Sequence, residues 1–383
     1  MKKGSNVRKK RRNHKKIIKI GVILFLIASI AAIIFFLVIN QKLHALYKMN
    51  VDEMISYTTK DKESALITIG IIHDGKMEYT VYGSDAKILP QKEYLYEIGS
   101  ITKTLTSSLL CKAIDEDKVH LEDHVNDYLN LPKNNHYPTL KQLVTHTSGY
   151  KSFYFEKQMM TNFFHGEDND FYGIDHITLK NRLFKVSVKD KTYPFCYSNF
   201  NMAVVGLVLE EVYQKDYPSL MKDYIQNELK LPNTKISDGT GDETGDGTGN
   251  LSGYWRWKLD DAYLPAGAIL STISDMMRYV TIHMSNELPY LALGHNCITN
   301  VNANTKQNEK MGIRIDSLGI GWIMDDEKDI IWHNGGTSNF NSYLTFDKEK
   351  QIGVVVLSNL SPKYRIPATV VGVKLMEQLQ NTY

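Results

Sequence analysis

The sequence predicts an α+β fold in which strands from both ends of the chain form one antiparallel sheet, flanked by helices and interrupted by an inserted helical region. Residues 65–82 and 318–357 hold the short apolar or alternating runs that are typical of strands. Residues from about 115 to 290 are mostly helical in pattern. An apolar run over residues 20–39 precedes all of these predicted strands and helices. We therefore expect a single N-terminal transmembrane helix and then one α+β domain over residues 63–383.

The first 40 residues determine the expected topology. The uncharged run IGVILFLIASIAAIIFFLVI would extend about 30 Å as a helix, which is the thickness of the hydrocarbon core. Ten Lys and Arg residues and no acidic residue precede it, and such a tail stays in the cytoplasm. A cleaved signal peptide is the alternative, but its apolar region is shorter and is followed by a small-x-small site. We expect a cytoplasmic tail over 1–19, a membrane anchor over 20–40, a stalk over 41–62 and an extracytoplasmic domain.

The composition excludes several classes of protein. Beyond residue 40 the chain carries 35 basic against 43 acidic residues, and an acidic domain is poorly suited to nucleic acid, whose binding depends on neutralising phosphates. Cys111, Cys196 and Cys297 are too few and too widely spaced for a disulfide framework or a zinc knuckle. His120 and His124 lie four residues apart but lack a third ligand. We expect no metal, no cofactor and no nucleic-acid partner.

The individual elements follow from hydrophobic periodicity and turn signals. Apolar spacing predicts a helix over 43–58, and the Asp74-Gly75 turn predicts a hairpin of strands over 65–72 and 77–82. The Gly/Asp/Thr tract at residues 238–250 is expected to be a flexible surface loop rather than a calcium site. The other predicted elements are helices over 100–115, 140–146, 199–213, 217–229 and 366–379, and strands over 318–324, 330–333, 341–346 and 352–357.

A Ser-x-x-Lys tetrad can bring a hydroxyl and an amine together on one face of a helix. If burial lowers the pKa of the amine, the amine can accept the serine proton and create a nucleophile. The tetrad occurs four times, beginning at Ser84, Ser100, Ser148 and Ser219. Only Ser100 follows a glycine and opens a mainly apolar helix, whose N-terminus would favour negative charge. From these residues alone, a nucleophile and a simple helix N-cap are equally supported.

Motifs elsewhere in the chain decide between these two interpretations. Tyr197-Ser198-Asn199 opens an apolar helix, and His333-Asn334-Gly335-Gly336 follows a predicted strand. With these motifs the sequence resembles the serine β-lactamase-like family, in the branch of class C β-lactamases, D,D-peptidases and esterases. The resemblance covers roughly residues 65–360 and implies a β-lactamase/transpeptidase-like fold. The further matching stretches, in the order of the family, are 96–103 (YEIGSITK), 143–149 (LVTHTSG) and 265–276 (PAGAILSTISDM).

The resemblance implies a role for each residue of the site. Ser100 would attack a carbonyl carbon and form an acyl-enzyme. Lys103 and Tyr197 would share the serine proton, and which of them is the base stays open because their titrations are coupled. Asn199 would hydrogen-bond Lys103 and the amide of the substrate. His146, in the Thr-His-Thr-Ser-Gly stretch, would brace a turn.

The motif His333-Asn334-Gly335-Gly336 would bind the substrate. The backbone N–H groups of Ser100 and Gly336 would form an oxyanion hole, and Gly335 and Gly336 would let the substrate backbone come close to a strand edge. Family members that bind a substrate carboxylate usually carry Lys where this chain has His333, whose charge is partial near neutral pH. The site therefore favours esters, or amides without a terminal carboxylate.

Three functions are consistent with this site. The first is an envelope hydrolase that acts on D-amino-acid amides or esters, such as peptidoglycan stems or D-alanyl esters. The second is a β-lactamase, and the third is a penicillin-binding sensor or scaffold that is acylated without turnover. The membrane anchor and the full set of catalytic residues favour the first, with a cell-envelope substrate as the partner. The sequence leaves the acyl donor, the acceptor and the oligomeric state open.

Overall fold

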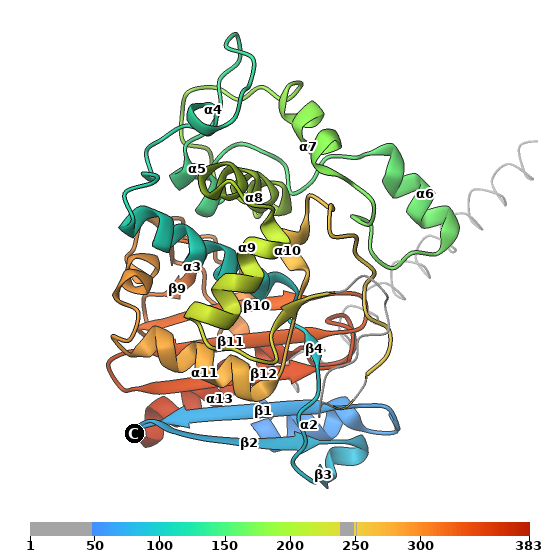
Figure 1. Cartoon of the computed structure of the whole chain (residues 1–383). Coiled ribbons are helices and arrows are strands. Elements are labelled where there is room, and N and C mark those ends of the chain that lie inside the picture. The colour runs from blue at the N-terminus through green and yellow to red at the C-terminus, as the bar shows by residue number, and fades with distance from the viewer. Residues whose placement is uncertain (1–47, 238–248, 250) are drawn as a thin grey trace, which may run out of the picture. The chain divides into compact units, whose positions relative to one another are not determined.

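The main sheet joins the two ends of the domain, as the sequence predicts (Figure 1). The computed structural model describes residues 48–237, 249 and 251–383. The first strand of the domain pairs antiparallel with the last strand, so that Ile69 lies opposite Val356. Across the sheet the order is β3 (Ile88–Leu89), β2 (Lys76–Tyr82), β1 (Ile67–His73), β12 (Ile352–Ser358), β11 (Asn341–Asp347), β10 (Ile330–Gly336), β9 (Ile323–Asp325), β8 (Ser317–Leu318) and β7 (Thr299–Asn300).

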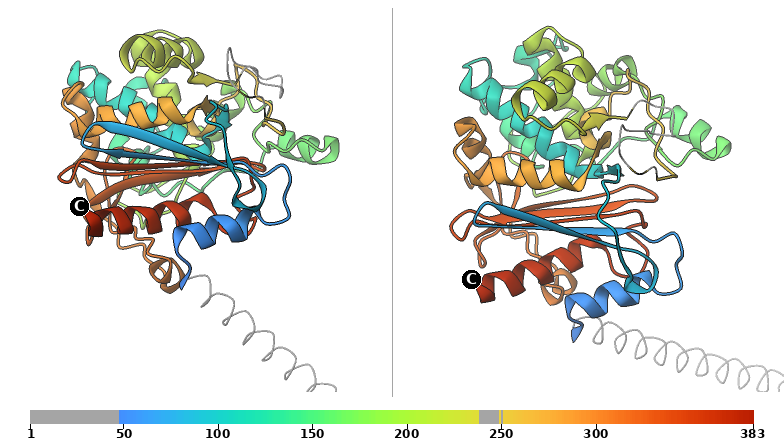
Figure 2. Two further views of the ribbon diagram at one scale, coloured as in Figure 1. Left: turned by 90° about the horizontal axis from the view of Figure 1, so that it is seen from below. Right: turned by 60° about the horizontal axis from the view of Figure 1, so that its bottom comes forward.

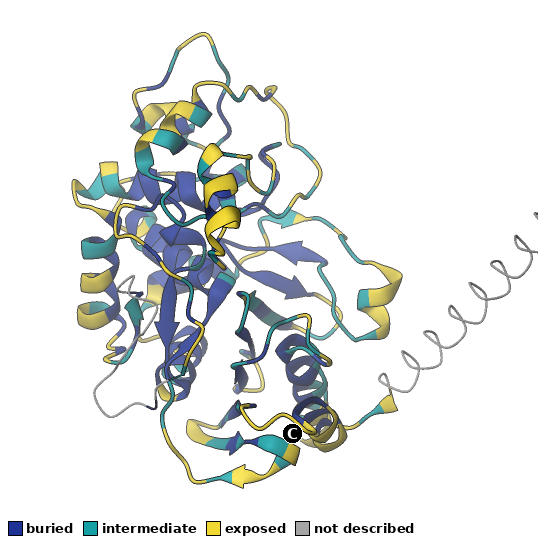
Figure 3. Ribbon diagram, turned by 90° about the vertical axis from the view of Figure 1, so that its right-hand side faces the viewer, coloured by how far each residue is buried: buried dark blue, intermediate teal, exposed yellow. Residues whose placement is uncertain are grey.

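Helices cover both faces of this sheet (Figure 2). The amphipathic helix α11 (Ile273–Met284) packs on one face, against β1, β11 and β12. Helices α13 (Ala368–Thr382) and α2 (Val51–Thr59) contact each other on the other face. Strands β11 and β12 are consequently buried along their whole length (Figure 3). The near-continuous apolar sequence of β12, IGVVVLS, fits a position between two helical layers.

The middle of the chain forms the helical region and a second, small sheet. That sheet has the order β4 (Tyr96–Glu97), β6 (Ile269–Ser271) and β5 (Lys235–Ile236). Helix α3 (Thr102–Asp115) is buried on nearly all sides, among α8 (Asn199–Tyr213), α10 (Leu264–Gly267) and the 3₁₀ helix Pro289–His295. The other helices are α4 (Val125–Tyr128), α5 (Leu140–Val144), α6 (Lys157–His165), α7 (His176–Leu183), α9 (Tyr217–Asp223) and α12 (Lys306–Lys310).

Several predicted boundaries are wrong. The single strand expected over 318–324 is the hairpin of β8 and β9, because Gly321, with φ of +75°, turns the chain back and pairs Leu318 with Ile323. Strand β10 continues to Gly336 instead of ending at residue 333. The last helix begins after Pro367, which serves as its N-cap. The helix expected over 217–229 ends at Asp223 and continues as a π-helical turn.

The predicted N-terminal segments fall partly outside the described residues. The expected membrane anchor, the basic tail and the loop at 238–250 (except residue 249) lie outside them. Within the described ranges, no helix has the length and apolar character that crossing a membrane requires. Helix α2 buries Val51, Met54 and Ile55 and belongs to the same compact unit as the sheet, residues 51–383. The second half of the expected stalk is therefore packed on the domain.

Candidate active site

Ser100 lies between β4 and α3, in the 3₁₀ turn Gly99–Ile101. Gly99 has φ of +51°, and a Cβ atom there would lie 2.5 Å from the backbone nitrogen of Gly336. Only glycine therefore lets this turn approach β10 so closely. The ammonium or amine nitrogen Nζ of Lys103 donates a hydrogen bond to Oγ of Ser100 at 2.9 Å. Of the four Ser-x-x-Lys tetrads, all of which lie in described residues, this is the one whose two side chains are hydrogen-bonded.

Lys103 is buried, with 1% of its surface exposed. Its second hydrogen bond goes to the carbonyl oxygen of Ala266 at 2.6 Å, and among the described residues it has no ion-pair partner. Burial lowers the pKa of Lys103 to about 7, because the charged form loses its hydration without gaining a counter-charge. A large fraction of the amine is therefore neutral at pH 7 and able to accept a proton from Ser100.

Tyr197 completes a cluster with these two residues. The Nζ atom of Lys103 lies 5.1 Å from the centre of the Tyr197 ring. Burial raises the pKa of the Tyr197 hydroxyl above its usual range, and hydrogen bonding with Ser100 opposes this only in part. The structure thus brings Ser100, Lys103 and Tyr197 together, and Tyr197 is a neutral phenol at pH 7.

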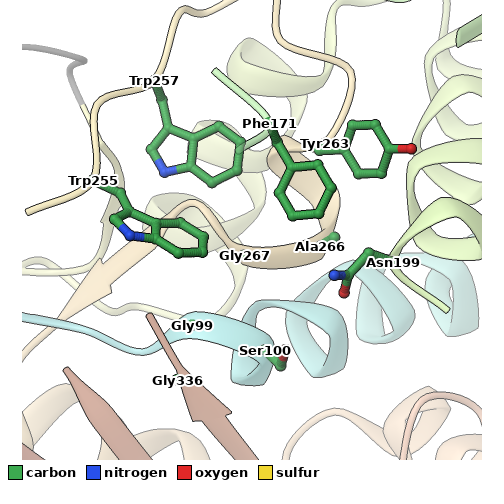
Figure 4. A pocket seen from close by; sticks show the side chains of 10 residues that line it. All are labelled: Gly99, Ser100, Phe171, Asn199, Trp255, Trp257, Tyr263, Ala266, Gly267 and Gly336. Atoms are coloured by element: carbon green, nitrogen blue, oxygen red, sulfur yellow. The ribbon is translucent and has the colours of Figure 1, made fainter. Parts of the chain in front are cut away.

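Asn199 begins helix α8 and lines a pocket together with Ser100 (Figure 4). The expected hydrogen bond between Asn199 and Lys103 is not found among the described residues. Lys103 is instead held by Ser100 and the Ala266 carbonyl. The Asn199 amide therefore remains available on the wall of the pocket, consistent with the part of its predicted role that concerns the substrate.

His333 lies within strand β10 and is buried, with 2% of its surface exposed. Its Nδ1–H donates to the carbonyl oxygen of Asn334 at 2.7 Å, and the centre of its ring lies 6.3 Å from that of Tyr197. Burial, reinforced by the nearby charge of Lys103, lowers the pKa of His333 to about 3. The expectation of partial charge near neutral pH is therefore wrong, and the imidazole is neutral.

His146 contacts Tyr197, which its sequence motif did not reveal. Its carbonyl oxygen accepts a hydrogen bond from the N–H of Cys196 at 2.8 Å, and its Nδ1 accepts one from the N–H of Ser198 at 3.3 Å. Its ring centre lies 4.7 Å from that of Tyr197. One residue thus holds the backbone on both sides of Tyr197. Burial, with nearby Lys103 and His333, lowers the pKa of His146 to about 3, so its Nδ1 remains an acceptor.

The end of strand β10 forms the other wall of the site. Its pairing with β9 ends at Trp332, so the edge beyond it faces the Gly99–Ile101 turn. A Cβ atom on Gly335 would lie 1.9 Å from the carbonyl oxygen of Ile98, which requires glycine there. Ser100 and Gly336, whose N–H groups are the predicted oxyanion donors, line the same pocket.

Two pockets meet at Ser100 and Gly336. The smaller one has an empty volume of about 310 Å³, and its large side chains are all aromatic: Phe171, Trp255, Trp257 and Tyr263. The larger one, of about 1180 Å³, is lined by aliphatic and proline side chains together with the aromatic residues Phe195, Tyr197 and Trp332 and some amides. No described residue that lines either pocket carries a formal charge at neutral pH. The two tryptophans were missed by the sequence reasoning, although their alternation around Arg256 was a visible signal.

Ser100 is hydrogen-bonded to a buried, partly neutral lysine, and the pair lies between a helical region and an antiparallel sheet. This arrangement is typical of the serine hydrolases with a β-lactamase/transpeptidase-like fold. Residues 52–371 match the Beta-lactamase family, and the chain belongs to this family. The family predicted from the sequence motifs is confirmed.

Individual relatives are distant. Protein flp of Staphylococcus aureus (strain MW2) is 22% identical over 336 residues, which are 83% of this chain and 64% of that protein; this chain therefore matches less than two thirds of it. A Beta-lactamase of Pseudomonas fluorescens is 22% identical over 343 residues, 81% of this chain and 92% of that protein. Among solved structures, a Beta-lactamase/D-alanine carboxypeptidase from Yersinia pestis has a TM-score of 0.67 at 21% identity, covering 86% of this chain and 96% of that one. These structural likenesses establish the fold.

Proposed function

We propose that this protein is a membrane-anchored, extracytoplasmic hydrolase that forms an acyl-enzyme through Ser100 and acts on D-amino-acid esters or amides of the cell envelope. The observation that carries the proposal is the 2.9 Å contact between Ser100 Oγ and the buried Nζ of Lys103, whose pKa is about 7. In this contact the protonated Nζ donates to Ser100 Oγ. When the amine is neutral, the direction can reverse, and the serine hydroxyl donates to Nζ.

The pKa values favour Lys103 over Tyr197 as the base. A phenol whose pKa is raised is a poor proton acceptor at pH 7, whereas an amine with a pKa near 7 is well matched to this task. The Ser100 oxygen bonds to the carbonyl carbon as its proton passes to Nζ. The oxyanion is stabilised by the N–H groups of Ser100 and Gly336. The bond to the leaving alcohol or amine then breaks and the leaving group takes the proton, with Tyr197 able to relay it. Water repeats these steps and releases the acid.

The charge of the site favours a substrate without a carboxylate at the scissile bond. His333 is neutral, and no described residue lining the two pockets is cationic. A carboxylate placed there would lose its hydration without gaining a counter-charge, which is costly. Esters, and amides with other termini, avoid this cost. This consideration supports the envelope hydrolase over a β-lactamase.

The proposed location follows from the sequence before residue 41. Ten basic residues and then twenty apolar ones support a single-pass anchor with its N-terminus in the cytoplasm. Protease added to protoplasts should digest the domain and leave the N-terminal tail intact. Protection of the domain would reverse the orientation and remove the envelope substrate.

The activity is tested by intact mass of the full-length protein after incubation with D-alanyl esters, D-alanyl amides and penicillin. We expect an acyl adduct that is absent in Ser100→Ala, with turnover fastest on esters. Fast turnover of penicillin with little on esters would favour the β-lactamase, and a stable penicillin adduct with no turnover of any donor would favour the sensor. Labelling that persists in Ser100→Ala would refute the nucleophile.

A further inference from the structure

The smaller pocket beside Ser100 is built from aromatic rings. In Figure 4 the side chains of Trp255, Trp257 and Phe171 surround the space above Ser100, and Asn199 closes one side. Phe171 is backed by Tyr263, with ring centres 4.4 Å apart. The other lining residues, such as Ala266 and Gly267, are small. Apart from the Asn199 amide and Ser100, the pocket therefore offers mainly aromatic rings to a bound group.

The segment that carries the two tryptophans alternates its side chains. Trp255 and Trp257 reach the pocket (Figure 4), whereas Arg256 between them turns away, bonds Glu167 at 2.5 Å and lies 4.7 Å from the centre of the Tyr172 ring. An extended segment places alternate residues on opposite sides. The guanidinium of Arg256 is thus held by partners outside the pocket.

The same segment is fixed before any ligand binds. The carboxylate of Glu97 accepts a hydrogen bond from the backbone N–H of Trp255 at 2.6 Å, and the indole Nε1–H of Trp255 donates to Ser338 at 3.0 Å. Asn169 donates to the carbonyl oxygen of Arg256 at 2.9 Å. Glu97 precedes Gly99 and Ser100 by only a few residues, so it ties the rings directly to the nucleophile segment. Groups held in this way lose little conformational entropy on binding.

These observations point to a cation as the occupant. The faces of aromatic rings carry negative partial charge, so rings arranged around a site attract an ammonium group, and tryptophan does so most strongly. A pocket meant for an aliphatic group needs no such rings. In the larger pocket on the other side of Ser100, the aromatic residues Phe195, Tyr197 and Trp332 are outnumbered by isoleucine, methionine, valine and proline, whereas every large side chain of the smaller pocket is aromatic. A carboxylate would be repelled by the ring faces.

We infer that the smaller pocket binds the ammonium group of a small α-aminoacyl substrate, such as an alanyl ester, while Ser100 attacks the adjacent carbonyl carbon. The four large aromatic side chains that line this pocket favour a small acyl group. The larger pocket is then left for the alcohol side of the ester. This inference rests on the proposed acyl-enzyme chemistry and adds the class of acyl group that the site selects.

The test compares methyl esters of D-alanine, D-lactic acid and isobutyric acid, which differ at one position as ammonium, hydroxyl and methyl. The full-length protein is assayed at pH 7 as wild type, Trp257→Leu, Trp257→Phe and Trp255→Leu, with Phe163→Leu, an exposed aromatic on α6, as the control. Because the three esters differ in intrinsic reactivity, the readout is the change in the D-alanyl to D-lactyl ratio of kcat/KM between variants. We expect this ratio to fall about tenfold in the Trp→Leu variants, less in Trp257→Phe, and not at all in Phe163→Leu.

A second measurement does not depend on turnover. Tetramethylammonium should slow the labelling of Ser100 by a fluorophosphonate in the wild type, whereas tert-butanol, which is similar in shape but neutral, should not. Equal losses on all three esters in Trp257→Leu, or equal protection by the two compounds, would overturn the ammonium site. Failure of the wild type to be labelled at Ser100 would instead overturn the proposed function, so the two failures are distinguishable.

Discussion

Replacing Lys103 with methionine should stabilise the fold and abolish activity. The pKa of the lysine falls from 10.5 to about 7 on burial. At about 1.4 kcal/mol per pKa unit, this shift corresponds to roughly 4–5 kcal/mol of lost stability, present in full at and below pH 7, where the unfolded chain keeps the lysine charged and hydrated. Methionine removes this cost but leaves the Ala266 carbonyl without its donor, a loss of about 1–3 kcal/mol. The net gain at pH 7 is therefore about 1–4 kcal/mol.

The gain has a defined pH dependence. Between pH 7 and 10.5 the folded wild type binds fewer protons at Lys103 than the unfolded chain does, so the stability of the wild type rises with pH over this window. The advantage of Lys103→Met is therefore largest at and below pH 7, shrinks by about 1.4 kcal/mol per pH unit above it, and becomes a deficit before pH 10.5, because the Ala266 carbonyl still lacks its donor. Urea unfolding of both full-length proteins at pH 6, 7, 9 and 10, followed by tryptophan fluorescence in the same detergent, measures it.

The matched control is Lys222→Met. Lys222 belongs to another Ser-x-x-Lys tetrad but lies exposed on α9, so its removal should give neither a gain in stability nor a pH trend. If Lys103→Met were equally stabilised at pH 6 and pH 10, or destabilised at every pH, then Lys103 is not held in its neutral form and the argument for it as the base fails.

Three further predictions concern the titration and the histidines. With Lys103 as the base, kcat/KM for a neutral ester should rise about tenfold per pH unit below pH 7 and level off above it. The variant His333→Gln should keep this profile, because His333 stays neutral above its pKa of about 3. An ionisation that vanishes in His333→Gln would show that His333 titrates. The variant His146→Asn keeps an acceptor for the Ser198 N–H and should retain most of kcat. The variant His146→Ala should lose roughly tenfold in kcat, with little change in KM and with a displaced pH profile. Equal effects of the two variants would count against the hydrogen bond between His146 and Ser198. His333→Lys should raise acylation by penicillin relative to a D-alanyl ester by about tenfold, or roughly 1.4 kcal/mol, and an unchanged ratio would mean that the lack of a cation does not limit carboxylate substrates.

The parts of the site that the sequence predicted are those that depend on local structure. Ser100 and Lys103 lie one helical turn apart, so their contact follows from helix geometry once the helix is recognised. The central strands of the sheet, β1, β12, β11 and β10, could be recognised from their apolar or alternating runs. The hairpin of β8 and β9 could not, because the apolar residues around Gly321 look like one continuous strand unless the positive φ of that glycine is known.

The parts that were missed depend on contacts between residues far apart in the sequence. His146 holds Tyr197 through backbone groups about fifty residues away, and no local pattern encodes this pairing. The neutral state of His333 results from burial beside Lys103, which only the packed domain reveals. Trp255 is fixed by Glu97 and Ser338, which come from opposite ends of the domain sequence.

The pairing of β1 with β12 has a consequence for the synthesis of the protein. Residue 67 pairs with residue 358, so the nascent chain cannot complete its central sheet until nearly its whole length has left the ribosome. Closing so long a loop makes this step slow relative to the formation of the helices. Strand β10, which brings Gly336 to the nucleophile turn, is also made late. A chain that is cut short before β12 therefore carries Ser100 and Lys103 without a finished site around them, and the site is complete only when β10, β11 and β12 have been made and paired.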